Sequence, residues 1–199
     1  MLCTELGDHI IPDACKPSMN DVVRMYYKLY NGAASDFDGA ADAAAYATAI
    51  QEETTWDAEI ALTGDDKLVG TPTIQSHDFP ETLPSLFQAE DSTGLGFDRP
   101  SRLVSFKCYG LTSANLEALK SSHQKPIKFC LYLKDGSVRV KKWASSATDI
   151  FFNAELMSVS DIVHVSGNAA DYVTIQLSLA YGAMDSFQDV PNCSFLATK

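Results

Sequence analysis

Residues 102–143 read RLVSFKCYGLTSANLEALKSSHQKPIKFCLYLKDGSVRVKKW, and this stretch decides the fold. It predicts a strand, then a short helix over Thr112 to Ser121, then two more strands joined at Asp135-Gly136. From Ile127 to Lys134, apolar residues alternate with more polar ones. Such alternation is typical of a strand that rests one face on a core, so the stretch predicts a β-rich protein.

The connection between the last two strands predicts a tight hairpin. Asp-Gly between two such runs is the strongest short-range hairpin signal, because a type I′ turn needs positive φ at both central residues. A two-residue turn at Asp135-Gly136 places Leu133 opposite Val138 and Leu131 opposite Val140. This register keeps the apolar side chains on one face of the hairpin.

Length and composition favour one domain. The chain has 199 residues, 46% of them hydrophobic, enough to bury a substantial core. Its apolar runs fall short of the roughly 18 residues that span a bilayer, and its N-terminus lacks a basic leader, so we expect neither a membrane nor a secreted protein. Five widely spaced cysteines without a CxxC pair favour buried or tolerated thiols in a reducing cytosol.

Charge is unevenly distributed along the chain. The net charge is −11, yet residues 99–142 hold ten basic residues against two acidic ones, a balance of +8. Residues 31–98 hold fourteen acidic residues against Lys67, a balance of −13. The two segments could meet between copies in a head-to-tail assembly, or both could be solvated faces of one monomer. Specific nucleic-acid binding is disfavoured because no reading motif accompanies the basic residues.

Further elements follow from periodicity. We expect strands at 22–30, 73–76, 150–157, 162–165 and 172–180, and a helix through the alanine-rich segment after Asp38 or Asp42, either of which could cap it. Trp56 to Thr63 fits a strand or a continuing helix, and we favour the strand. The rest of residues 64–100 reads as a long loop, with Phe79, Leu83, Leu86 and Phe87 as apolar members that either fold back on the core or dock onto an adjacent copy.

The sequence gives no catalytic, cofactor-binding or metal-binding residues, and we predict a protein that is not an enzyme and has no cofactor. Gly94-Leu95-Gly96 lacks the third glycine and the helix of a phosphate-binding fingerprint, so it reads as a loop. His77-Asp78 also reads as a loop pair, since no nucleophile accompanies it. His9, His123 and His164 share no metal-ligand spacing.

The layout resembles the tail-tube and related tail structural proteins of bacteriophages. The resemblance spans about Val22 to Gly182 and rests on VVRMYYKLYNGA (22–33), the alanine-rich helix, GTPTIQSHDFPET (70–82), LTSANLEALKSSHQKPIKFCLYLKDGSV (111–138) and YVTIQLSLAYG (172–182). It implies rings of identical copies that stack through loops and arms and enclose a β-lined channel for DNA ejection. It also implies a virion protein made in the host cytoplasm, with other tail or connector proteins as partners and DNA passing without specific binding.

We therefore expect one mainly β (α+β) domain over residues 1–199, an antiparallel β-sandwich or barrel with one or two flanking helices. Within it, residues 1–21 would form an N-terminal arm, 22–182 the core with a long loop at 64–100, and 183–199 a C-terminal arm. The alternatives are a head–tail connector or completion protein of the same fold and a carbohydrate- or peptide-binding β-sandwich that uses Trp56 and Trp143. A small enzyme is a further rival.

Overall fold

The structure of the protein is a computed structural model, which describes residues 22–30, 37, 40–78, 86–88, 94–97, 101–144, 149–164, 171–180, 183–184 and 186–199. The expected N-terminal arm, the alternative cap Asp38 and the loop residues Phe79 and Leu83 lie outside these residues.

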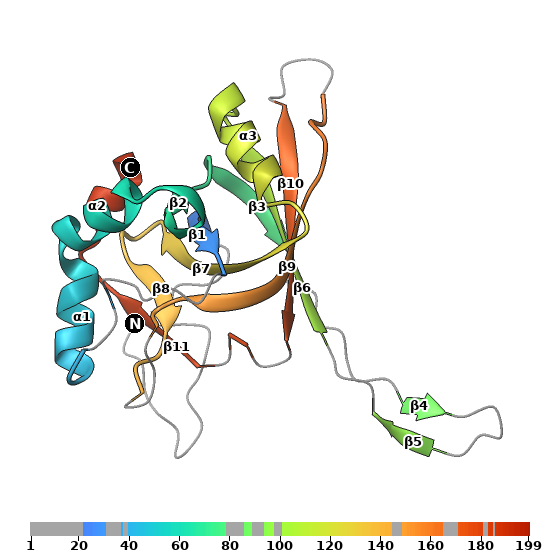
Figure 1. The fold of residues 1–199 in the computed structure, drawn as a ribbon, viewed down its shortest axis with the longest axis horizontal. Helices are drawn as coiled ribbons and strands as arrows, with labels where there is room; N and C mark the ends of the chain where they lie inside the picture. Colours follow the sequence, from blue (N-terminus) through green and yellow to red (C-terminus); the bar gives the residue numbers. More distant parts are fainter. Residues whose placement is uncertain are drawn as a thin grey trace, which may run out of the picture.

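Strands dominate the described part of the chain (Figure 1). They are β1 (Val22–Leu29), β2 (Val69–Gly70), β3 (Ile74–Asp78), β4 (Leu86–Gln88), β5 (Gly94–Phe97), β6 (Ser101–Tyr109), β7 (Lys125–Leu133), β8 (Val138–Lys141), β9 (Phe152–Val159), β10 (Tyr172–Ala180) and β11 (Phe187–Val190). The helices are α1 (Ala43–Gln51), α2 (Glu53–Ala61) and α3 (Ser113–Ser121), with short 3-10 helices η2 (Gly64–Asp66) and η3 (Ser194–Thr198).

The fold is mainly β (α+β), as the sequence predicts, with an antiparallel sheet that curls into a half-barrel. The strand order is β11-β8-β7-β9-β10-β6-β3, and β1 pairs with the remaining edge of β7. Residues 69–78 connect the two ends of the curled sheet, because β2 pairs with β1 and β3 pairs with β6. The described part of the chain holds three α-helices, where the sequence predicts one or two.

The two faces of β7 serve two separate cores. Ile127, Phe129, Leu131 and Leu133 belong to the inner core, the buried cluster inside the curl. Cys130 and Tyr132 belong to the outer core, the second buried cluster, which also contains Trp56 of α2 and Leu196 of η3. A strand buried on both faces sits at the centre of its fold, and β7 pairs with β1 on one edge and with β8 and β9 on the other.

The predicted strand at Trp56 to Thr63 is wrong, because Trp56 lies in helix α2. Its indole N–H donates to the Ile50 carbonyl at 2.7 Å, and its ring is fully buried against Tyr26 and Phe37. The helix before it is capped by Asp42, whose carboxylate accepts from two backbone amides. Apolar residues four apart favoured the helix, and the anchored Trp56 side chain settles it.

The predicted hairpin exists, but its register is shifted by one residue. Leu131 pairs with Arg139, and Tyr132 pairs with Val138. The turn has three residues, because the Leu133 amide donates to the Ser137 carbonyl and only Gly136 has positive φ, at 82°. Because of this shift, Val138 and Val140 face the outer core and are buried there. The predicted register would have placed them on the same face as Leu131 and Leu133.

The C-terminal segment belongs to the folded body, which corrects the expected arm. Strand β11 pairs with β8 over four residues, and the following Cys193 and Leu196 are buried in the outer core. Residues 64–100 are likewise less irregular than expected, since they contain β2 to β5. Of the segment 162–165, the structure describes an isolated bridge between Val163 and Tyr172 in place of a strand.

Candidate assembly surfaces

The histidines that drew attention in the sequence make structural contacts. His123 follows α3, and its Nδ1 accepts a hydrogen bond from the Val159 amide at 3.0 Å. His164 pairs with Asp171 at 2.8 Å on an exposed surface. His77 and Asp78 are consecutive residues of β3 and not a loop pair, while His9 lies outside the described residues. His123 and His164 therefore contact different parts of the chain.

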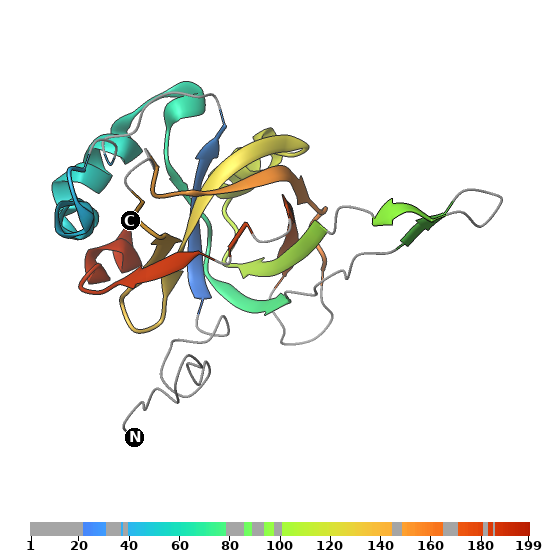
Figure 2. The same cartoon turned by 90° about the horizontal axis from the view of Figure 1, so that it is seen from below.

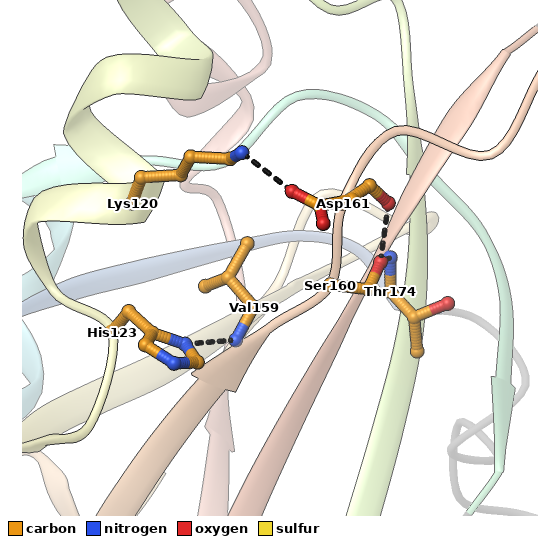
Figure 3. Close-up of polar contacts among 6 residues, drawn as sticks. All are labelled: Lys120, His123, Val159, Ser160, Asp161 and Thr174. Carbon is orange, nitrogen blue, oxygen red and sulfur yellow. Dashed lines mark hydrogen bonds and ion pairs between the residues drawn. The ribbon is translucent and has the colours of Figure 1, made fainter.

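Figure 3 shows how the C-terminal end of α3 is fastened to the start of the β9–β10 connection. Lys120 Nζ contacts Asp161 Oδ1 at 2.8 Å, which lowers the pKa of Asp161 by hydrogen bonding and by charge. Ser160 Oγ donates to the Asp161 carbonyl and accepts from the Thr174 amide. Ser160 and His123 thus bond to backbone groups and not to each other, so the cluster joins elements and supplies no activated nucleophile.

The remaining candidates within the described residues are metal ligands, reactive thiols, a phosphate-binding loop and a membrane-spanning helix. No group of three His, Cys, Asp or Glu residues is placed to hold a metal ion there. Cys108, Cys130 and Cys193 are free and buried, and burial raises the pKa of Cys108 to about 12, so it stays an unreactive thiol. Gly94 and Gly96 lie in strand β5 and not in a loop. Among the described helices, none has the length and apolar character to cross a membrane.

Both aromatic residues proposed for a ligand cleft contribute to packing. Trp56 is fully buried, and Trp143 is half-buried against the outer core. A carbohydrate- or peptide-binding cleft needs an exposed aromatic face, which Trp56 does not offer.

The β4–β5 hairpin stands away from the body of the molecule (Figures 1 and 2). It forms a separate two-stranded sheet, in which β4 and β5 pair with each other and with no other described strand. The hairpin interrupts the path from β3 to β6, which are neighbours in the main sheet. An isolated two-stranded hairpin is at best marginally stable in water, so packing against another surface would stabilise this one.

The part of the sheet's outer face over β6, β10 and β9 carries no described helix, and we call it the uncovered face. Helices α1 and α2 lie on the opposite side of the molecule from β6, as Figure 2 shows. On the uncovered face, Leu103 of β6 and Leu156 of β9 both lie opposite Ser178 of β10, and these leucines are 40% and 41% exposed. The next row consists of Ser105, Gln176 and Ser158. Within β6, β10 and β9, two adjacent rows of this face are therefore uncharged, and the second row continues to Asp78 of β3.

Several ion pairs of the +8 segment and of the −13 segment lead to other parts of the chain. Lys120, Lys128 and Arg139 of the basic segment pair with Asp161, Asp149 and Asp189, which follow it in the chain. In the acidic segment, Glu59 pairs with Lys28, and Glu53 and Asp57 pair with Lys199.

Comparison with known proteins adds no family. Neither the protein-family models nor the curated proteins that were searched match this chain.

Proposed function

We propose that this protein is a structural subunit that assembles with identical copies into rings of a phage tail tube or of a related tail or connector assembly. The observation that carries the proposal is the β4–β5 hairpin, which projects from a curled antiparallel sheet and has no partner strand in the described part of its own chain. A neighbouring copy would supply the missing surface.

The uncovered sheet face supports the same proposal. Leu103 and Leu156 flank Ser178 in one row, and an uncharged polar row lies beside it. Burying uncharged residues costs less desolvation than burying charges, so such a face suits contact with another protein surface. In a closed ring, the uncovered face of each copy would contact a different surface of the next copy. Every uncovered face in the ring would then be buried.

The acidic character of the chain fits a channel through which DNA slides. A net charge of −11 repels phosphate, whereas a protein that grips DNA neutralises phosphates with lysine and arginine. The resulting hypothesis is a virion protein whose partners are its own copies and other tail or connector proteins, with DNA passing through without specific contacts.

A connector or completion protein of the same fold makes the same use of these surfaces and forms a single ring. Electron microscopy of the purified protein at increasing concentration distinguishes the alternatives. The proposal predicts rings or tubes, with tubes for a tail-tube protein and discrete rings for a connector. A species that sediments as a monomer at high concentration would overturn both.

A further inference from the structure

The pairing of β7 with β9 ends where the chain leaves helix α3. Lys125 pairs with Met157, and the antiparallel register would next place residue 123 opposite Val159. The backbone turns away before that point. Gln124 has positive φ, at 58°, and its amide donates to the Met157 carbonyl at 2.7 Å, while the amide of residue 123 donates to the Lys120 carbonyl.

The side chain of His123 takes the place of the next backbone acceptor (Figure 3). Its Nδ1 accepts a hydrogen bond from the Val159 amide at 3.0 Å, and Val159 is 7% exposed. A buried backbone amide without an acceptor costs free energy, so the imidazole serves as the last acceptor of the β7–β9 pairing. An accepting nitrogen carries no proton, so the neutral ring holds its proton on Nε2.

This acceptor differs from a backbone carbonyl because it can take up a proton. Histidine is the side chain that ordinarily changes charge between about pH 5 and 8. The imidazolium form carries an N–H on both ring nitrogens and cannot accept a hydrogen bond. Protonation of His123 would therefore break its bond to the Val159 amide in a pH range where backbone hydrogen bonds do not titrate.

The charged form of His123 would have favourable surroundings as well. It follows the C-terminus of α3, where the helix dipole favours a cation. The Lys120 ammonium lowers the pKa of Asp161, and a positive charge on His123 lowers it further, so Asp161 is near enough to attract the imidazolium. The charged groups of the neighbouring elements are Lys120 of α3, Lys125 of β7 and Asp161 of the β9–β10 connection, while Val159, the β9 residue in contact, is uncharged.

We propose that His123 is a pH-sensitive switch at the end of β9. When neutral, its ring binds the Val159 amide and joins the α3–β7 turn to β9. When protonated, it releases that amide and is attracted to Asp161, which loosens the start of the β9–β10 connection. The switch acts within one chain, so it does not depend on the proposed assembly.

Residue-resolved hydrogen-exchange mass spectrometry at about pH 7.5 and about pH 5.5 tests the switch. The protection factor of the Val159 amide, which is corrected for the intrinsic effect of pH on exchange, should fall at least about threefold at the lower pH. Protection of the amides in β1 is the internal reference for the stability of the whole fold, and it should stay within about twofold.

Three variants separate the titration of His123 from its packing. His123→Asn keeps an acceptor oxygen near the position of Nδ1 but cannot titrate, so the Val159 amide should stay protected at both pH values. His123→Ala removes the acceptor, so protection should be low at both. His164→Asn is the matched control, because the Nδ1 of His164 contacts the Asp171 carboxylate at 2.8 Å, and this variant should behave as the unmodified protein.

Constant protection of the Val159 amide in the unmodified protein would overturn the proposal. An equal fall in His123→Asn, or an equal fall in β1, would also overturn it, since the effect of acid would then come from other groups. Electron microscopy of the same samples reports assembly separately.

Discussion

Lys28 on β1 and Lys128 on β7 lie directly opposite one another, and both are buried. Like charges in opposite positions of an antiparallel pair are destabilising. Each lysine is compensated by an acidic residue from a different part of the chain: Glu59 of α2 contacts Lys28 at 3.0 Å, and Asp149, ahead of β9, contacts Lys128 at 2.5 Å. The packing of α2 on the sheet is thereby coupled to the charge balance of its central strands.

Replacing Glu59 with glutamine should strongly destabilise the protein. The substitution keeps the side-chain shape but leaves the Lys28 ammonium, 2% exposed, without its carboxylate. Removing one partner of a buried pair costs about 3–5 kcal/mol, and urea denaturation of E59Q should show a loss of this size. The double variant K28M/E59L should recover most of it, because no charge is then buried.

The surface pair Lys120–Asp161 is the matched comparison for that measurement. Both side chains are largely exposed, so solvent screens their attraction. D161N should leave the urea midpoint unchanged. A loss in E59Q no greater than in D161N would show that the buried pair does not stabilise α2 against the sheet.

Gly136 should tolerate asparagine better than alanine. Its φ of 82° lies in the left-handed region, and a Cβ there would meet Ser194 only at an ordinary 3.7 Å, so backbone strain dominates the cost. Gly136→Ala should destabilise by about 1–2 kcal/mol, and Gly136→Asn by less. Equal losses in chemical denaturation would point to contact with Ser194 as the cause.

This turn shows where sequence reasoning stops. The Asp-Gly pair and the alternation of β7 correctly predict a hairpin, but turn type fixes register, and the local sequence does not distinguish two loop residues from three. Asp135 decides in favour of three by accepting hydrogen bonds from both the amide and the hydroxyl of Ser137. Val138 then faces a second core, whose existence no single strand pattern reveals.

The other errors have the same origin. Alternation in β1, β7 and β10 predicted strands because each carries a continuous apolar face. For Trp56 and the C-terminal segment the sequence predicts the wrong structure, because their burial depends on partners distant in sequence. Leu196 is buried in the outer core, and its carbonyl accepts from the Tyr26 hydroxyl at 2.5 Å, a contact between residues 170 positions apart. The sequence predicts a loop for the β4–β5 hairpin because both strands are short and β5 contains two glycines among its four residues.

Stability should fall in alkaline solution. Burial raises the pKa of Tyr27 from 10.0 and of Cys108 from 9.0, each to about 12. The unfolded chain therefore loses these protons first, and stability that is intact below pH 9 declines as the pH rises through 12. Tyr27→Phe should remove about 2 kcal/mol of this decline by pH 12, measured by urea denaturation across the range. A decline of identical slope in both proteins would contradict the assignment to Tyr27.

Salt should weaken assembly if the +8 and −13 segments meet between copies. Exposed charges more than about 8–10 Å apart are largely screened at 0.1–0.15 M salt, and buried apolar contacts are not. Sedimentation at increasing sodium chloride concentration measures the effect. Assembly that does not change with salt would leave the uncharged face of Leu103 and Leu156 as the main contact and exclude pairing of the two charged segments.

Replacing residues 86–97 with a short Gly-Ser linker should abolish assembly without unfolding the protein. Strands β4 and β5 pair with each other and with no other described strand, so the main sheet keeps its described pairings and the unfolding midpoint of the excised variant should stay close to that of the full chain. A second variant carries a Gly-Ser segment of the original length, which keeps the length of the segment but loses its strand propensity. It tests whether assembly needs the paired strands or only a segment long enough to reach a neighbour. If the hairpin docks on a neighbour, both variants sediment as folded monomers. Tubes or rings formed by either variant would show that the copies associate through another surface.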